Sequence, residues 1–218
     1  MTQTIAFFDM DRTVLRDSSG MLYMRYMWSR GEVGRAAMLR SYWYAALYKV
    51  GFLNYPAVAA KLAEITAKAN EAETTTFCQR FFDEMMVHYV AEKAVQCLNE
   101  HRAQGHVVTL ISASTPYVVA PVAHYLGIND YLCTRLEVVG GRLTGSILLP
   151  TCYGPDKVLW AQDFLRRHDG DLAQAYFYTD SYSDLPLLQC VGCPVAVNPD
   201  PRLKAHAMRE GWPIEMFY

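Results

Sequence analysis

Apolar runs that stop abruptly at polar residues recur along the chain. The first run covers 4–8, and Asp9 follows it directly. Three further runs, 107–111, 175–179 and 194–197, end in polar residues in the same way. Continuous apolar runs of this length are typical of parallel strands that are covered on both faces. The pattern therefore predicts four buried strands, each followed by a polar loop.

Helical sequence fills most of the spaces between these runs, and a long insertion separates the first run from the second. Strands that alternate with helices predict an α/β fold with a Rossmann-like, doubly wound parallel sheet. We expect 1–17 and 105–218 to form this α/β core, and 18–104 to form an inserted helical cap domain. The helices expected in the insertion cover 20–29, 33–50, 56–69, 72–86 and 91–103.

Two other segments need separate interpretations. In 136–145, Gly140 and Gly141 separate two short runs of strand-like sequence, which predicts a β-hairpin. The segment 107–129 contains no Asp, Glu, Lys or Arg and is long enough to cross a bilayer. It also contains two prolines and several hydroxyl groups, which would leave backbone groups unpaired in lipid. We therefore expect a buried strand, a polar loop and a packed helix there, with no membrane contact.

The composition excludes several classes of protein. Apolar residues make up 52% of the chain and charged residues 19%, which excludes a disordered, collagen-like or coiled-coil chain. Twenty Lys and Arg against 22 Asp and Glu leave a formal charge of −2, so no basic field would attract nucleic acid. No basic region precedes the first apolar run, and Asp9 and Asp11 interrupt it. We expect no signal peptide and a cytoplasmic protein.

Six cysteines are spread through the chain. Without an export signal, they are expected to be reduced, mostly buried thiols rather than a disulfide framework. Cys190 and Cys193 form a single C-x-x-C pattern, which also suits a redox pair or half of a zinc site. Because no second pair of ligands completes a zinc site, the structural interpretation is favoured.

The sharpest chemical signal is the pair Asp9 and Asp11. Residues i and i+2 of an extended segment project to the same side, so two carboxylates should converge just past the end of a strand. Like charges this close need a proton or a cation between them, and Mg²⁺ prefers oxygen ligands. The pattern D-x-D-x-T is also typical of a capped turn. Its position directly after a buried strand favours the interpretation as a site.

Asp180 and Asp184 form a second acidic pair, again just past an apolar run. The carboxyl ends of parallel strands meet at one edge of a sheet, so both pairs should lie together there. Four carboxylates around one point require a metal ion. Lys157 precedes a helical run and would offset the surplus negative charge, although a lysine in such a place is ordinarily a surface residue.

Ser112 ends the second predicted strand. Its hydroxyl, together with the backbone N–H groups of Ala113 and Ser114, is placed to hold an anionic oxygen. A single serine at such a position is more often only a helix cap. The acidic pairs and the lysine that accompany Ser112 therefore favour its interpretation as an anion-binding residue.

The order of these motifs along the chain is D-x-D-x-T, Ser, Lys and D-x-x-x-D. This combination resembles the haloacid dehalogenase (HAD) superfamily of phosphohydrolases over essentially the whole chain. Within it, the runs 7–13 and 180–187 look most like those of the phosphoserine-phosphatase-like subfamily. The long helical insertion resembles the C1-type cap of that superfamily.

The resemblance implies a phosphatase mechanism and a set of ligands. Asp9 would be the nucleophile that forms an aspartyl-phosphate, and Asp11 would serve as general acid and then general base. A dehalogenase would have no use for that acid, so phosphoester hydrolysis is favoured. Mg²⁺ would be held by Asp9, the backbone carbonyl of Asp11 and Asp180, with Asp184 acting behind them or through water. The residues that would hold the phosphate are Ser112, Ala113 and Lys157.

The implied substrate is a small phosphorylated metabolite. Phosphoserine phosphatases carry a glutamate shortly after the first motif, which receives the substrate's ammonium group. No glutamate occurs there in this chain, so Asp17 and Ser18 are the candidate substrate-binding residues. Those enzymes also have Ser-Gly-Gly at the second motif, where this chain has Ser-Ala-Ser at 112–114. We expect a small phosphomonoester, with a phosphorylated amino alcohol such as phosphoserine or histidinol phosphate included.

Three other functions share part or all of the pattern. A signalling receiver domain also uses acids, a hydroxyl group and a lysine, but it is far shorter and lacks the insertion. A non-catalytic binding or scaffold protein on this fold would not need every charged position to be filled. A phosphotransferase that passes the phosphoryl group to an alcohol shares every motif, so this alternative stays open.

Overall fold

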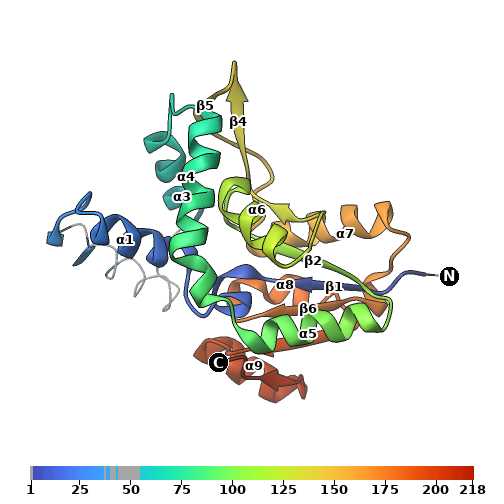
Figure 1. Ribbon diagram of the computed structural model, residues 1–218. Coiled ribbons are helices and arrows are strands. Elements are labelled where there is room, and N and C mark those ends of the chain that lie inside the picture. Colours follow the sequence, from blue (N-terminus) through green and yellow to red (C-terminus); the bar gives the residue numbers. More distant parts are fainter. Residues whose placement is uncertain (1, 37, 40–42, 44–54) are drawn as a thin grey trace.

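A six-stranded parallel sheet organises the protein (Figure 1). The computed structural model describes residues 2–36, 38–39, 43 and 55–218. The strand order is β3-β2-β1-β6-β7-β8, and every neighbouring pair is parallel. This order confirms the predicted doubly wound α/β core. The strands are β1 (Ile5–Phe8), β2 (Val107–Ser112), β3 (Leu132–Cys133), β6 (Tyr176–Thr179), β7 (Cys193–Val197) and β8 (Ile214–Glu215).

The four longer strands of the sheet coincide with the four apolar runs. The sequence did not predict β3 and β8, which contain two residues each and lie at the two edges. The strand order reverses between β2 and β6, on either side of β1. In open α/β sheets, ligands bind outside the carboxyl ends of the strands at such a point.

Helices cover both faces of the sheet. Because side chains alternate along a strand, Ala6 and Phe8 pack into one layer and Ile5 and Phe7 into the other. All four side chains are fully buried. Burial of each phenylalanine stabilises the fold by roughly 1.5–3 kcal/mol. The first layer contains α5 (Glu92–Ala103) and α6 (Pro116–Tyr125), and the second contains α7 (Lys157–Arg167), α8 (Leu185–Leu188) and α9 (Pro201–Glu210).

Part of the insertion projects away from the sheet (Figure 1). It contains α1 (Ser19–Ser29), α3 (Tyr55–Ile65) and α4 (Glu71–Glu84). The predicted hairpin is present as β4 (Arg135–Val139) and β5 (Arg142–Leu148) and packs beside α3. Its turn is formed by Gly140 and Gly141, whose φ angles of 57° and 72° suit glycine. The predicted helix over 33–50 lies largely outside the described residues.

Helix α5 falls within the range expected for the cap but packs on the sheet. Its buried Ala94 and Leu98 belong to the same apolar cluster as Phe8 and Leu110. We therefore propose that the core resumes at α5 rather than at residue 105.

Short helical turns complete the chain: η1 (Met10–Val14), η2 (Met86–Tyr89), η3 (Gly154–Asp156), η4 (Leu172–Gln174) and η5 (Tyr182–Asp184).

The uncharged stretch 107–129 begins with β2, continues as a short polar loop and contains α6, as predicted. Across the described ranges, no helix combines the length and apolarity that a bilayer crossing requires.

All six cysteines are free thiols. Cys190 is exposed and Cys193 is half-buried, and the two form no disulfide.

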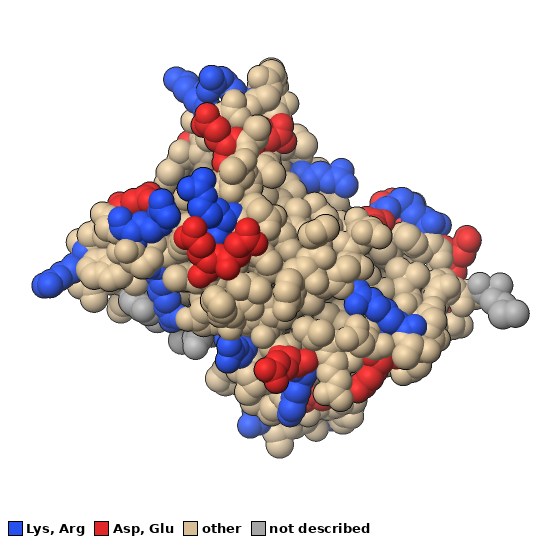
Figure 2. Space-filling model, in the orientation of Figure 1, with Lys and Arg blue, Asp and Glu red and all other residues tan. Residues whose placement is uncertain are grey.

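Charges of both signs are interspersed over the face shown in Figure 2, in small groups separated by uncharged residues.

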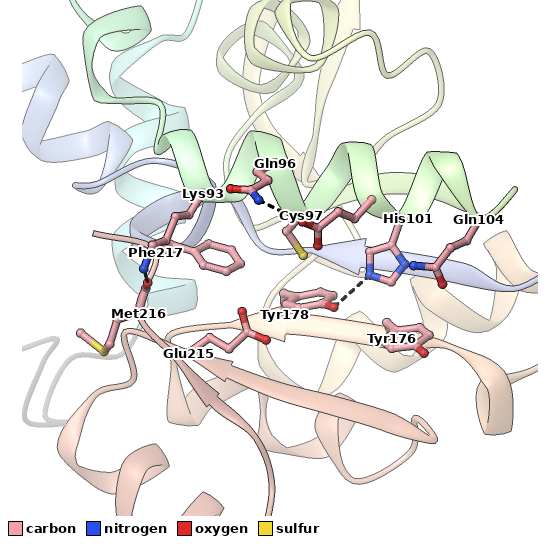
Figure 3. Close-up of a pocket in the computed structure, with 11 residues that line it drawn as sticks. Lys93, Gln96, Cys97, His101, Gln104, Tyr176, Tyr178, Glu215, Met216 and Phe217 are labelled. Atoms are coloured by element: carbon pink, nitrogen blue, oxygen red, sulfur yellow. Dashed lines mark hydrogen bonds between the residues drawn. The ribbon is translucent and has the colours of Figure 1, made fainter.

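A groove of about 480 Å³ lies between α5, β6 and the chain's last residues (Figure 3). On its floor, His101 Nε2 lies 2.9 Å from the Tyr178 hydroxyl. Burial, reinforced by His106, lowers the pKa of His101 to about 4, so the imidazole is neutral at pH 7. The lining contains none of the predicted site residues.

Candidate active site

The turn that follows β1 sets the positions of the first acidic pair. The Asp9 N–H donates to the Tyr178 carbonyl at 2.9 Å, which continues the pairing of β1 with β6 by one residue. The chain then enters the π-helical turn η1, closed by a 2.8 Å bond from the Leu15 N–H to the Met10 carbonyl. Arg12 has a left-handed φ of 58° in this turn. The backbone is extended at Asp9 and at Asp11, with ψ angles of 152° and 126°, and it turns sharply at Arg12.

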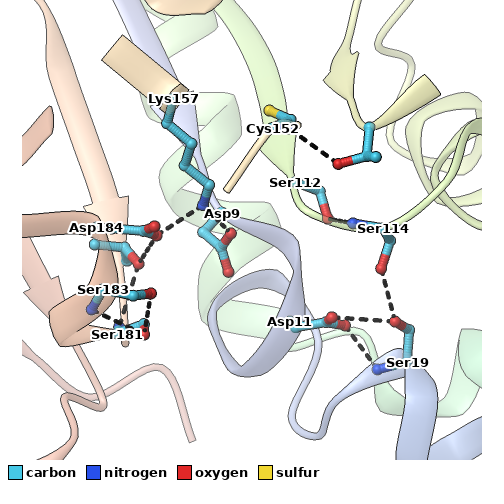
Figure 4. A network of polar contacts seen from close by, with 12 residues as sticks. Asp9, Asp11, Ser19, Ser112, Ser114, Cys152, Lys157, Ser181, Ser183 and Asp184 are labelled. Atoms are coloured by element: carbon cyan, nitrogen blue, oxygen red, sulfur yellow. Dashed lines mark hydrogen bonds and ion pairs between the residues drawn. The ribbon is translucent and has the colours of Figure 1, made fainter. Parts of the chain in front are cut away.

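Lys157 joins the first acidic pair to the second (Figure 4). Its ammonium lies 2.6 Å from Asp9 Oδ1 and 2.7 Å from Asp184 Oδ2. The Thr179 hydroxyl donates to the same Asp184 oxygen at 2.8 Å. Lys157 is only 1% exposed, so it is not the surface residue that its sequence context alone suggests. It is the first residue of α7, and from there its side chain reaches the carboxyl ends of β1 and β6.

Burial and charge act in opposite directions on this group of three ions. Burial alone lowers the pKa of Lys157, but the Asp184 and Asp9 carboxylates outweigh it and hold that pKa well above its usual value. The lysine therefore stays protonated. Burial raises the pKa of Asp9 to about 7, because the charges of Asp184 and Asp11 reinforce it and Lys157 only partly opposes it. A further cation beside Asp9 would favour the ionised carboxylate.

Asp11 has a different environment, although it is two residues away. The Ser19 N–H donates to Asp11 Oδ1 at 2.6 Å, and the Ser19 hydroxyl donates to Asp11 Oδ2 at 3.1 Å. Ser19 is the first residue of α1, and its hydroxyl also lies 3.0 Å from the Ser114 hydroxyl. Burial raises the pKa of Asp11, and the two bonds from Ser19 oppose that shift. Neutral donors therefore hold this carboxylate.

Ser112 lies at the end of β2 and is 1% exposed. Its hydroxyl accepts a hydrogen bond from the Ser114 N–H at 3.2 Å. The backbone N–H groups of Ala113 and Ser114 were both expected to hold an anion. In the structure, the Ser114 N–H is already bonded within the loop. The Ser112 hydroxyl hydrogen remains to be donated, because the serine oxygen is the acceptor in this bond.

Asp180 follows β6 directly and is 9% exposed. Burial, followed by the charge of Asp9, raises its pKa well above the usual value, and Arg12 opposes this shift. Within the described part of the chain, no N–H or O–H group donates to its carboxylate. A buried carboxylate without a donor requires either a proton or a cation. Asp180 therefore has the properties expected of a cation ligand.

The four acids lie at one edge of the sheet, but they do not form a complete cage for a metal. Among the described residues, no three His, Cys, Asp or Glu side chains are gathered closely enough to hold a metal ion by themselves. The bonded Asp184 oxygen already contacts Lys157 and Thr179. The Asp9 and Asp180 carboxylates and the Asp11 carbonyl remain, an all-oxygen set. Such a set suits Mg²⁺, which keeps several waters and uses few protein ligands.

Asp17 and Ser18, the candidate substrate-binding residues, have structural partners in this conformation. The Asp17 carboxylate lies 3.0 Å from an Arg25 nitrogen. The Ser18 hydroxyl accepts a 3.3 Å bond from the Met21 N–H and so caps α1. Contact of either residue with a substrate stays a prediction.

The family model for haloacid dehalogenase-like hydrolases matches residues 6–189. The chain belongs to this family. The predicted HAD-type phosphatase is thereby confirmed at the level of family and enzyme class.

Curated relatives of this haloacid dehalogenase-like hydrolase bear phosphatase names. "Phosphoserine phosphatase SerB1" of Mycobacterium tuberculosis is 31% identical to it, over 97% of this chain and 70% of the relative. "Histidinol-phosphatase" of Neisseria meningitidis is 29% identical, with 99% of each chain covered. The similarity to phosphoserine phosphatases that the motifs indicated is therefore confirmed.

Solved structures share the whole fold of this hydrolase. A Bordetella pertussis protein of unknown function matches with a TM-score of 0.88 and 27% identity, with all of both chains covered. A substrate-bound phosphoserine phosphatase complex matches with a TM-score of 0.73 and 18% identity, covering 100% of this chain and 94% of that one. The second likeness concerns the fold alone.

The sequence did not predict three side-chain hydroxyl contacts at the site of this hydrolase, although it had named the backbone N–H of Ser114. Thr179 contacts Asp184, while Ser19 and Ser114 lie next to Asp11. Thr179 is the last residue of an apolar run, so its position beside the acidic loop was a usable signal. Ser19 and Ser114 are far apart in the sequence, and no local pattern connects them.

Proposed function

We propose that the protein is a Mg²⁺-dependent phosphatase that hydrolyses a small phosphomonoester through an aspartyl-phosphate on Asp9. One observation carries the proposal: two carboxylates only two residues apart have different partners. The Asp9 carboxylate contacts an ammonium group, which suits a group that must stay ionised to attack phosphorus. The Asp11 carboxylate contacts neutral donors, which suits a group that exchanges a proton.

In the first half-reaction, Asp9 attacks the phosphorus atom and the bond from phosphorus to the ester oxygen breaks. Asp11 gives its proton to that departing oxygen. The Ser112 hydroxyl and the Lys157 ammonium hold phosphoryl oxygens, which is the main requirement of phosphoryl transfer. Lys157 also keeps the Asp9 carboxylate in place for the attack.

In the second half-reaction, water cleaves the aspartyl-phosphate. Asp11 is now ionised and takes a proton from that water, so both proton transfers use the same carboxylate. Asp9 returns as a carboxylate beside Lys157. Mg²⁺, held by Asp9, Asp180 and the Asp11 carbonyl, would supply positive charge to the phosphoryl oxygens.

We propose a phosphorylated amino alcohol as the substrate class. The names of two relatives support this, because phosphoserine and histidinol phosphate are both phosphate monoesters of amino alcohols. Asp17 is the proposed partner of the substrate's ammonium group, with Ser18 beside it. Binding of an ammonium group would then compete with the Arg25 guanidinium for the Asp17 carboxylate.

Turnover of p-nitrophenyl phosphate tests the reaction. We expect activity that depends on added Mg²⁺, disappears with a chelator and falls at least about 10³-fold in Asp9→Asn. Asp163→Asn is the matched control, since Asp163 is an exposed carboxylate on α7. Sustained turnover in Asp9→Asn would overturn the proposal. A stable phosphoprotein without turnover would indicate a receiver-like function instead.

A screen of phosphorylated metabolites at fixed Mg²⁺ tests the substrate class. We expect phosphorylated amino alcohols to give the highest kcat/KM. A clear preference for nucleic acid, phosphoprotein or phospholipid would contradict this expectation. Alcohol acceptors added to the same assay distinguish hydrolysis from phosphotransfer, because a transferase would form a new phosphate ester and release less inorganic phosphate.

A further inference from the structure

The bonds around Asp11 extend beyond the acidic motif into the cap and into the loop after β2. Resting on the proposed function, we propose that Ser19 and Ser114 are positioning residues that orient the Asp11 carboxylate for proton transfer to the leaving group. Figure 4 shows the chain of contacts from Asp11 through Ser19 to Ser114 and Ser112. These four residues come from three separate segments of the chain.

Ser19 fixes both oxygens of the carboxylate. Its N–H donates to Asp11 Oδ1 and its hydroxyl to Asp11 Oδ2, at 2.6 and 3.1 Å. Two donors from one residue prevent rotation of the carboxylate about its own bond. The N–H belongs to the first turn of α1, where backbone N–H groups have no partner within the helix. The carboxylate therefore depends on where α1 begins.

The Ser19 hydroxyl is not needed as a helix cap. The preceding residue, Ser18, already caps α1 by accepting from the Met21 N–H. The Ser19 side chain instead turns toward Asp11 and Ser114 and is 6% exposed. Its two contacts therefore lie outside its own helix, which indicates a role in positioning rather than in starting the helix.

Ser114 anchors the other end of the contact. Its hydroxyl lies 3.0 Å from the Ser19 hydroxyl. Its N–H donates to the Ser112 hydroxyl at 3.2 Å, and its carbonyl accepts from the Thr134 N–H at 3.1 Å. Three contacts thus hold Ser114 in one place. It connects the residue proposed to hold phosphate, Ser112, with the residue that orients the acid.

A positioning role has a consequence that a purely structural role lacks. A carboxylate that donates a proton to the leaving group matters most when that group departs poorly without one. Loss of the orientation should therefore slow esters of weakly acidic phenols more than esters of strongly acidic phenols. General loosening of the site should slow all esters by the same factor.

The test is a series of aryl phosphates from p-nitrophenyl phosphate to phenyl phosphate, measured at saturating Mg²⁺. For Ser19→Ala we expect kcat/KM on phenyl phosphate, which reports the first half-reaction alone, to fall by about 10- to 100-fold, part of the 10²–10⁴-fold that acid catalysis contributes. On p-nitrophenyl phosphate the fall in kcat/KM should stay below about threefold, because the nitrophenolate leaves without a proton. Ser114→Ala should give the same pattern with smaller factors.

Three further variants sharpen the result. Ser19→Thr keeps the hydroxyl and the N–H, so it should restore the phenyl phosphate rate. The double variant of Ser19→Ala and Ser114→Ala should be no slower than Ser19→Ala alone, because both act through one chain of contacts. Ser29→Ala is the matched control, since Ser29 lies at the other end of α1 and its hydroxyl donates to the Tyr26 carbonyl.

Equal falls in kcat/KM for all aryl phosphates, or a double variant whose loss is the product of the single losses, would overturn the inference. So would a Ser19→Ala rate on phenyl phosphate within twofold of the unsubstituted protein. If Ser19→Ala does not fold, Ser114→Ala alone decides, because its side chain is half-buried and lies outside the helix. Activity that survives in Asp9→Asn would instead contradict the proposed function, so the two failures are distinguishable.

Discussion

Asp9 and Asp11 divide the candidate site into two halves that are held together by different forces. The ionic half consists of Asp9, Asp184 and Lys157, joined by contacts of 2.6 and 2.7 Å. The hydroxyl half consists of Asp11 with Ser19 and Ser114, joined by contacts of 2.6 to 3.1 Å. Similar distances therefore join charged partners in one half and neutral partners in the other.

The difference lies in the charge of the group that contacts each carboxylate. An ammonium group stabilises an ionised neighbour and resists its protonation, whereas hydroxyl and amide donors are less selective between the two states. The halves also differ in origin. The ionic half comes from the residue after β1, from η5 and from α7, while the hydroxyl half uses the first residue of α1. Only the hydroxyl half therefore depends on the inserted segment.

The largest effect is expected from breaking the ionic half with Lys157→Met. Removal of one partner leaves buried carboxylates uncompensated, which should lower the free energy of unfolding by about 3–5 kcal/mol. Activity should fall at least about 10³-fold, since both the phosphoryl oxygens and Asp9 lose their cation. Urea unfolding and steady-state kinetics on p-nitrophenyl phosphate measure the two losses.

A second substitution separates these losses. Adding Asp184→Asn to Lys157→Met removes one of the stranded charges, so part of the lost stability should return while activity stays lost. If the double variant were no more stable than the single variant, the lysine would not be serving as the counter-ion of Asp184. The comparison between the two halves would then lose its electrostatic basis.

Asp180→Asn comes next, because Asp180 is the buried carboxylate without a donor among the described residues. We expect activity to fall at least about 10²-fold and Mg²⁺ to lose its stabilising effect on the protein. In metal-free buffer the same variant should be more stable than the unsubstituted protein, by about 1–2 kcal/mol, since a buried charge has been removed. Thermal unfolding with and without Mg²⁺ measures both effects. Equal Mg²⁺ stabilisation of both proteins would contradict the role of Asp180.

The ionic half also predicts how the metal-free protein responds to pH. The pKa of Asp9 is raised to about 7 in the folded protein, above its usual 3.8. The folded state therefore binds this proton more tightly than the unfolded state does. Its contribution to stability is fully present below about pH 4 and is lost as the pH rises through about 7. Asp9→Asn should consequently raise Tm at pH 8 in metal-free buffer, with a difference that shrinks toward zero near pH 4. A difference independent of pH would contradict the shift.

The sequence predicted the ionic half better than the hydroxyl half. Asp9 follows an apolar run directly and Asp184 lies in the polar loop after another, so each run predicts both a strand and the place where an acid lies. Lys157 was recognisable by its order among the motifs, but its burial depends on how α7 packs and had no local signal. The two-residue strands β3 and β8 had none either, because they are too short for a pattern.

The hydroxyl half depends on a contact between Ser19 and Ser114 that no local sequence pattern predicts. Ser19 and Ser114 are 95 residues apart, and their contact requires α1 to begin beside the loop after β2. The departure from Ser-Gly-Gly at the second motif was visible in the sequence, but it pointed only to doubt about the substrate. The structure gives the second hydroxyl of that motif a partner beside Asp11.

The smallest expected effect compares two hydroxyl–carboxylate bonds, one from each half. Thr179 donates to Asp184 at 2.8 Å and Ser19 donates to Asp11 at 3.1 Å, so distance alone ranks the Thr179 bond as the stronger. Asp184 nevertheless keeps its contact with Lys157 when that hydroxyl is lost. Thr179→Val should therefore lower the free energy of unfolding by about 1–2 kcal/mol and lower kcat by less than about fivefold.

The ranking by rate should therefore reverse the ranking by distance. On phenyl phosphate, Ser19→Ala should lose more activity than Thr179→Val, while Thr179→Val should lose at least as much stability. Thr179→Ser keeps the hydroxyl and should recover the stability, which separates the lost bond from the changed shape. A Thr179→Val variant that loses rate selectively on phenyl phosphate would show that the ionic half also orients the acid. The two halves would then act as one network, because a neutral bond to Asp184 would matter as much to proton transfer as the bonds to Asp11.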